Sequence, residues 1–159
     1  MKVGIIMGSS SDKDVMRAAG RVLDEFGVSW SAHIISAHRA PELLREQIVK
    51  MEADGAGCFI AGAGLAAHLP GVIASLTTVP VVGVPLKAAL DGMDSLLSIV
   101  QMPKGIPVAT VGINNSTNAA LLAVQFLYSG DNNLQNKMKQ YRVDMKEKLA
   151  KENRDGVVL

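Results

Sequence analysis

Residues 2–12, KVGIIMGSSSD, decide the fold class of this chain. The apolar run 3–7 shows no polar alternation, which is typical of a strand buried on both faces. A Gly-Ser loop follows, and apolar residues then recur at helical spacing over residues 15–26 until Gly27, a typical helix stop. The stretch therefore predicts a buried strand that leads through a tight polar loop into a helix.

The same alternation of strand and helix continues to about residue 130. Further strands are expected at 28–35, 58–61, 80–84 and 107–112, and further helices at 41–55, 70–76, 91–101 and 118–128. Five short strands without clean alternation imply burial on both faces, and helical crossovers imply a parallel sheet. We predict an α/β fold of the flavodoxin-like kind, a three-layer sandwich whose five-stranded parallel sheet has the order 2-1-3-4-5.

Several helix starts carry a local signal. Ser11 with Asp14 has the spacing of a capping box, so the first helix is expected to begin there. Pro41 and Pro70 suit the first turn of a helix. Asp91 is expected to cap the fourth helix.

The C-terminal segment differs from the rest of the chain. A long helix is expected from about 131 to 153, with an apolar stripe of Leu134, Met138, Tyr141, Met145 and Leu149. This stripe packs either on its own domain or on a neighbouring subunit, because a helix stripe does not name its partner. We predict one domain over residues 1–159, with a core at about 1–130 followed by this helix.

The composition excludes several classes of protein. The chain has 159 residues, 48% of them hydrophobic, with 16 basic against 15 acidic side chains. A nucleic-acid-binding protein would need a strong basic excess, and a disordered chain would be less apolar. No apolar run reaches the roughly 20 residues of a membrane-spanning helix, and the N-terminus lacks a signal-peptide layout. We expect a cytoplasmic protein that binds neither nucleic acid nor membranes.

Ligands of an open parallel sheet bind beyond the carboxyl ends of its strands, at the point where the strand order reverses. The loops at those ends are residues 8–12, 36–41 and 62–70, together with 85–91 and 112–118. The first loop has a glycine and three serine hydroxyls just before a helix start. It is either a phosphate-binding loop or an ordinary cap of that helix. Asp12 would repel a phosphate and suits a sugar diol, whose hydroxyls donate to a carboxylate.

His38 and Arg39 stand side by side in the second loop. The imidazole can take or give a proton near neutral pH, and the guanidinium can hold a phosphate or carboxylate in a fork. A surface histidine and a solvated arginine are the alternative interpretation of this pair. The sequence alone leaves both open.

The third loop holds Gly62 and Gly64 at a spacing that loosely matches a dinucleotide-binding fingerprint. That fingerprint needs an acidic residue about 20 positions later, and residues 55–90 contain none. We interpret the loop as one whose backbone comes close to a ligand, with His68 at its end either facing that ligand or bonded to backbone.

Cys58, the only cysteine, is expected to be a buried, inert thiol. The spacing of the histidines and the cysteine predicts no metal site.

Together these loops resemble one known family. Residues 7–12 (MGSSSD), 36–41 (SAHRAP) and 61–71 (AGAGLAAHLPG), extended by 94–103 (DSLLSIVQMP) and 105–108 (GIPV), look like the signatures of N5-carboxyaminoimidazole ribonucleotide mutases. These mutases are the class I form of the aminoimidazole ribonucleotide carboxylase family, and the resemblance covers roughly residues 3–128. It implies an isomerase of de novo purine biosynthesis that moves a carboxyl group from N5 to C4 of one ribonucleotide. It also implies a flavodoxin-like subunit in a homo-octamer, without a metal or organic cofactor.

The resemblance also implies roles for individual residues. By motif position, His38 would be the general acid/base and His68 would line the pocket for the carboxylate and CO2. Ser9, Asp12 and Arg39 would bind the ribonucleotide. The predicted substrate-binding set is completed by Gly8, Ser11, Ser36, Gly64 and Leu65. In this family the C-terminal helix reaches onto neighbouring subunits, which favours the intersubunit interpretation of the 134–149 stripe.

Two features bear on which member of the family this chain is. A second form of the family carboxylates aminoimidazole ribonucleotide directly with CO2, and it typically has Lys after the histidine and lacks the Gly-rich loop. Arg39 and the loop around Gly64 favour the mutase. The chain departs from the family at Leu65, where Gly is usual, and at 113–118, where the loop is shorter and more polar.

A flavodoxin-type electron carrier is the alternative function from another class of protein, because the first loop also suits a flavin phosphate.

Overall fold

The computed structural model describes residues 1–154 and contains one parallel sheet with the strand order β2-β1-β3-β4-β5. This confirms the predicted order and the flavodoxin-like fold class. The strands are β1 (Lys2–Met7), β2 (Ser29–Ile34), β3 (Ala56–Gly64), β4 (Val81–Leu86) and β5 (Ala109–Thr110). At its carboxyl end β1 pairs with both neighbours, since Met7 stands opposite Ile34 on one side and Gly62 on the other.

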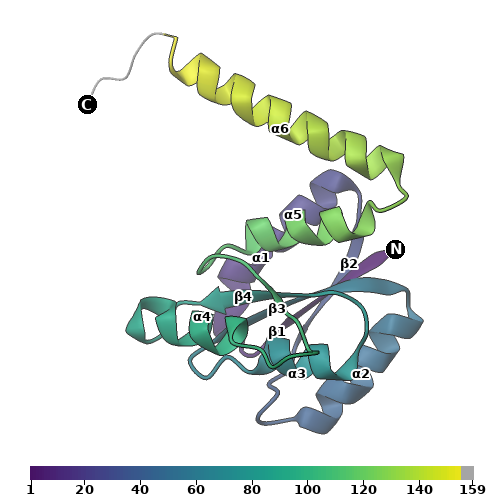
Figure 1. Cartoon of the computed structure of the whole chain (residues 1–159), viewed down its shortest axis with the longest axis vertical. Coiled ribbons are helices and arrows are strands. Elements are labelled where there is room, and N and C mark those ends of the chain that lie inside the picture. Colours follow the sequence, from purple (N-terminus) through teal and green to yellow (C-terminus); the bar gives the residue numbers. More distant parts are fainter. Residues whose placement is uncertain (155–159) are drawn as a thin grey trace.

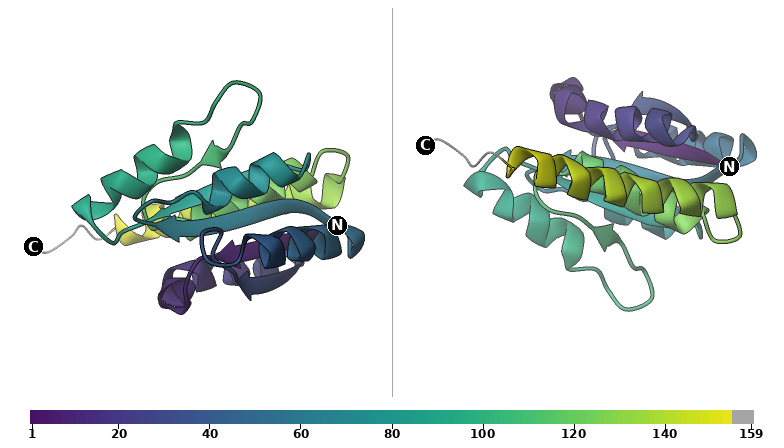
Figure 2. Two further views of the ribbon diagram at one scale, coloured as in Figure 1. Left: turned by 90° about the horizontal axis from the view of Figure 1, so that it is seen from below. Right: turned by 90° about the horizontal axis from the view of Figure 1, so that it is seen from above.

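Helices cover both faces of the sheet (Figure 1). On one face lie α1 (Lys13–Phe26) and α5 (Ser116–Leu127), and on the other α2 (Pro41–Ala53), α3 (Leu69–Leu76) and α4 (Met93–Val100). Single 3-10 turns, Ser10–Asp12 and Leu90–Gly92, precede α1 and α4. The long C-terminal helix α6 (Asn132–Glu152) lies outside the layer of α1 and α5 (Figures 1 and 2). No helix in the described range is long and apolar enough to cross a membrane.

Two apolar clusters, one on each side of the sheet, hold these layers together. Side chains of β1 alternate between them: Val3 and Ile5 pack toward α1 and α5, and Ile6 packs toward α2. Full burial of one such side chain stabilises the fold by about 1.5–3 kcal/mol. Gly4 is required between the clusters, because a Cβ there would lie 2.6 Å from the Phe59 ring. β1, β3 and β4 are therefore buried on both faces, as the unbroken apolar runs predicted.

The edge strands differ from the prediction that all five strands are buried on both faces. β2 is largely exposed, and Trp30 and Ile34 are only partly covered on the side of α1. β5 has two half-buried residues where six were expected. β3 is longer than expected, because Gly62 and Gly64 continue its pairing with β4. An edge strand has one neighbour and a narrower helix layer above it, which explains the weaker burial at both edges.

Two helix starts also differ from the prediction. The capping box is formed by Ser9 and Asp12 around the 3-10 turn, not by Ser11 and Asp14. Both pairs have the same spacing, but the chain makes one tight turn before the α-helix begins at Lys13. Asp91 does not cap α4: it has a left-handed backbone (φ 54°), and its carboxylate pairs with Lys87 at 2.8 Å.

The stripe of α6 divides into two halves. Met138 is buried, and Leu134 and Tyr141 pack against the cluster beneath α1 and α5, with Tyr141 5.8 Å from the Phe26 ring centroid. This first half packs on its own domain. Met145 and Leu149 are more than half exposed, so the second half finds no apolar cover within residues 1–154.

Cys58 provides a test of the core. Its side chain is fully buried, which confirms the predicted burial, and burial raises the pKa of the thiol to about 12. Because the thiolate is the reactive form, we expect a thiol reagent at pH 8 to label native protein at a negligible rate and urea-unfolded protein at one site per chain. The unfolded thiol has a pKa of about 8.5, so the stability linked to Cys58 is complete below pH 8.5 and is lost as pH rises toward 12. Fast labelling of the native protein would contradict this packing.

Candidate active site

The carboxyl ends of β1, β2 and β3 meet at one cavity of about 410 Å³. All ten predicted site residues line it: Gly8, Ser9, Ser11, Asp12, Ser36, His38, Arg39, Gly64, Leu65 and His68. Two backbone hydrogen bonds set the spacing of the three loops, from Ile35 N to Met7 O (2.9 Å) and from Gly8 N to Gly62 O (3.3 Å). The sheet register therefore brings together residues separated by up to 60 positions in the sequence.

The first loop is held in shape by its own side chains. The backbone N–H of Ser9 donates to Asp12 Oδ2 at 2.9 Å, and the backbone N–H of Ser11 donates to Ser9 Oγ at 3.4 Å. The Ser11 hydroxyl lies 3.0 Å from Ser9 Oγ and 3.2 Å from Asp12 Oδ1. The loop therefore caps a helix start, as one interpretation predicted, and the side chains of Ser9, Ser11 and Asp12 also line the cavity.

The second loop turns at residues 37–39 and carries the charged group of the site. The Arg39 guanidinium donates one N–H to the carbonyl of Gly8 at 3.0 Å, across the gap between the first two loops. A guanidinium has five N–H donors, so most remain for a ligand. Arg39 is therefore a fixed cation at the mouth of the cavity, and Asp12 is an acceptor in the neighbouring loop.

The second and third loops meet at a pair of histidines. His38 Nε2 lies 2.8 Å from His68 Nδ1, and the two rings stand nearly perpendicular at 80°. One nitrogen must donate and the other accept, so a single proton occupies this bond and the bonded pair holds at most one imidazolium. The second nitrogen of each ring stays free of that bond. This arrangement can store one proton and pass it on.

The first part of the third loop, residues 62–67, is made of glycine and alanine apart from Leu65. Gly64 sits where a Cβ would lie 3.2 Å from the carbonyl oxygen of Leu86. Ala67 is buried, and Leu69 begins α3 directly behind His68. Leu65 has a left-handed backbone (φ 55°) and its side chain is 55% exposed. The loop therefore brings backbone, not charged side chains, to one wall of the cavity.

The loop after β4 contributes Ala88 to the cavity, a residue that the sequence analysis did not single out. The only sequence signal for Ala88 is its position in a loop that follows a strand. Asn114 supports this loop from behind: its side-chain oxygen accepts from Lys87 N at 2.9 Å, and its own N–H donates to Pro85 O at 2.8 Å. The 112–118 loop thus supports the wall of the site and does not line it.

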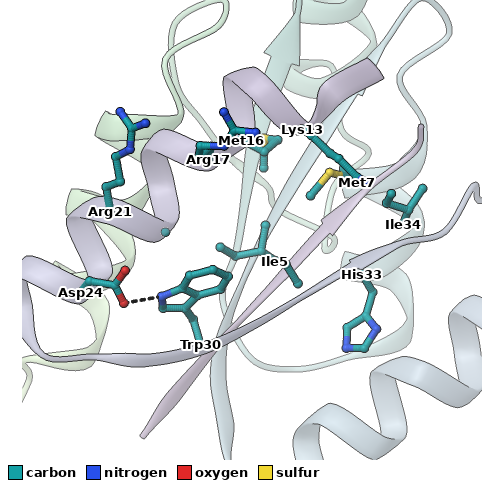
Figure 3. A pocket seen from close by; sticks show the side chains of 12 residues that line it. Ile5, Met7, Lys13, Met16, Arg17, Arg21, Asp24, Trp30, His33 and Ile34 are labelled. Carbon is teal, nitrogen blue, oxygen red and sulfur yellow. Dashed lines mark hydrogen bonds between the residues drawn. The ribbon is translucent and has the colours of Figure 1, made fainter. Parts of the chain in front are cut away.

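A second cavity, of about 590 Å³, lies between α1 and β2 (Figure 3). Its walls are mainly apolar, and the indole N–H of Trp30 donates to Asp24 Oδ1 at 2.8 Å along one side. His33 borders it, but its Nε2 lies 3.1 Å from the side-chain nitrogen of Gln47. This cavity is larger than the first, but the two share no lining residue. Among residues 1–154, no group of three His, Cys, Asp or Glu side chains is placed to hold a metal ion.

The fold and the first cavity define a class of protein: a flavodoxin-like α/β enzyme with a histidine pair, an arginine and a hydroxyl-rich loop at the switch point of its sheet. A family model described as AIR carboxylase matches residues 2–148. The chain belongs to the AIR carboxylase family.

Individual relatives agree with this assignment. The N5-carboxyaminoimidazole ribonucleotide mutase of Pyrococcus horikoshii is 59% identical over 148 residues, which are 92% of this chain and 84% of that protein. The phosphoribosylaminoimidazole carboxylase of Saccharomyces cerevisiae is 54% identical over 148 residues, but these are only 26% of its length. The crystal structure of PurE from Treponema denticola matches with a TM-score of 0.88 at 28% identity, over 96% of both chains.

Proposed function

We propose that this chain is an N5-carboxyaminoimidazole ribonucleotide mutase, which moves a carboxyl group from N5 to C4 of its substrate in purine biosynthesis. The single observation that carries the proposal is the His38–His68 pair at 2.8 Å, inside a cavity that also holds Arg39 and the hydroxyl-rich loop. Relatives named as this mutase, at 50–59% identity over most of the chain, support it. The whole chain then forms one mutase domain.

The two ends of the ribonucleotide go to different loops. Arg39, with the hydroxyls of Ser9 and Ser11, suits the phosphate, because a guanidinium and hydroxyls donate to its oxygens. Asp12 suits the ribose hydroxyls, which donate to its carboxylate. The aminoimidazole ring is then directed toward the histidines and the Gly64 loop.

The reaction needs one proton in and one proton out. When the bond between N5 and the carboxyl carbon breaks, its electron pair returns to N5, CO2 is released in the pocket, and N5 takes a proton. C4 then attacks the carbon of CO2 to form the new bond. The proton on C4 leaves, and its electron pair restores the aromatic ring. The net proton count is zero, so a group that gives a proton and takes one back is sufficient.

The histidine pair meets this requirement. In the proposed mechanism His38 gives the proton to N5 and later removes the one from C4, while His68 shares that proton and faces the carboxylate. A positioned acid/base contributes about 10²–10⁴ in rate, and holding CO2 beside C4 adds a proximity effect. The small residues around Gly64 place backbone dipoles near the carboxylate without a permanent cation that would oppose decarboxylation.

The sequence is also compatible with two other functions. Arg39 and the Gly-rich loop disfavour the direct carboxylase. Relatives that carry a carboxylase name do not restore it, because this chain matches only about a quarter of their length. An electron carrier would need an aromatic ring against its flavin. The histidines are the only aromatic rings that line the first cavity, and Trp30 lines the other one.

We also propose the cytoplasmic homo-octamer that the resemblance implies. Met93, Leu97 and Val100 form one face of α4 and are each about half exposed. Met145 and Leu149 are exposed on the distal half of α6. Exposed apolar faces of this kind are typical of surfaces that a second chain covers.

The first test supplies N5-carboxyaminoimidazole ribonucleotide in buffer stripped of CO2, with a chelator present. We expect fast formation of the C4-carboxylated nucleotide, because the migrating CO2 comes from the substrate. The measurement is the product spectrum over time. Product that forms only from aminoimidazole ribonucleotide with added bicarbonate would instead identify a direct carboxylase.

The second test is the variant His38→Asn. It keeps a side chain that can form hydrogen bonds but cannot carry the proton, so we expect kcat to fall by about 10²-fold or more with nucleotide binding preserved. Arg39→Ala is the matched variant in the same loop, and it should raise KM with a smaller effect on kcat. Normal turnover of His38→Asn would refute the acid/base role.

The third test concerns assembly. Leu97→Glu places a charge on the apolar face of α4, and we expect sedimentation to show a shift from eight chains to smaller species. Val49→Glu on the exposed side of α2 is the control and should sediment like the wild type. Eight chains in both variants would show that α4 is not an interface.

A further inference from the structure

Leu65 occupies a position that the fold alone does not explain. Its backbone is left-handed (φ 55°), a region that a Leu side chain disfavours and that glycine enters freely. Burial does not compensate, because the side chain is 55% exposed and belongs to neither apolar cluster. Where such a residue also lines a site, as Leu65 does, the strain points to a role in that site.

The surroundings of Leu65 show what the site gains. It lines the same cavity as His38 and His68, three residues before the second of them. The other lining residues are Gly, Ala, polar or charged, except Leu69, which is buried at the start of α3. Leu65 is thus the one large apolar side chain on the open side of this cavity.

We propose that Leu65 is an apolar cover that keeps water out and CO2 in while the carboxyl group is detached. This inference rests on the proposed mutase reaction, in which CO2 is free between the breaking of the bond to N5 and the formation of the bond to C4. A small apolar molecule escapes less readily past a hydrocarbon wall than through an open, hydrated mouth. The adjacent Gly64 is packed against Leu86 and Ala88, which anchors the loop and leaves the Leu65 side chain to contact the substrate.

The test measures CO2 retention directly. Unlabelled N5-carboxyaminoimidazole ribonucleotide is given to the enzyme in buffer that contains ¹³C-bicarbonate and carbonic anhydrase, and ¹³C in the C4-carboxylate is measured by mass spectrometry. We expect little label with the wild type and a several-fold higher labelled fraction, with more aminoimidazole ribonucleotide released, for Leu65→Ala and Leu65→Gly. Val49→Ala, at a similarly exposed position on α2, should match the wild type.

Thermal unfolding separates the cover from a structural role. Leu65→Gly removes the strained side chain, so we expect Tm to rise by about 2–4 °C, whereas Leu65→Ala keeps a Cβ in the left-handed region and gains nothing. A fall in Tm for Leu65→Gly would show that the leucine serves the fold. Label fractions equal to the wild type in both variants would overturn the proposal. Full labelling by the wild type itself would overturn the mutase function instead.

Discussion

The pairing of β1 with both β2 and β3 is the interaction on which the site depends. Met7 ends β1 opposite Ile34 on one side and Gly62 on the other, and β3 ends two residues later at Gly64, so the three loops leave the sheet close together. Parallel strands all point their carboxyl ends the same way, and the switch in connection direction at β1 opens a crevice between the loops. A shift of either neighbour by one residue would turn its side chains to the opposite face and separate His38 from His68.

Small residues make this arrangement possible at the centre of the sheet. A Cβ on Gly62 would lie 2.5 Å from Met16 Sδ, so α1 packs directly on β3 there. The same close packing holds the start of α1, and with it Ser9 and Asp12, at a fixed distance from the third loop. The core thus positions the chemistry: the apolar clusters fix the helices, and the helices fix the loops.

Much of this follows from the sequence because the informative signals are local. The unbroken apolar run of β1 and the stops at Gly27 and Gly55 indicate the alternation of strand and helix, and alternation implies a parallel sheet. The ten site residues come from the resemblance together with the rule that ligands bind at strand ends. The contact between His38 and His68 could not be predicted, because it spans 30 residues and depends on the register of two strand pairings. The prediction of the first helix cap was wrong for a different reason, since Ser9–Asp12 and Ser11–Asp14 offer the same pattern two residues apart.

Edge burial was mispredicted because the sequence does not state how far each helix layer extends. The same holds for exposed apolar side chains: the sequence does not tell apart Leu97, on a proposed interface, from Trp30, which lines a cavity of its own chain.

The proposed chemistry adds a constraint on the site. Both histidines are exposed in the single chain, yet a step that sets CO2 free needs a dry, closed pocket. In the proposed mechanism the substrate, Leu65 and, in the proposed octamer, a neighbouring chain would supply this cover. In the proposed mechanism a neighbouring chain would cover the pocket throughout and the substrate would cover it during each turnover, so Leu65 is the apolar cover that this chain itself supplies.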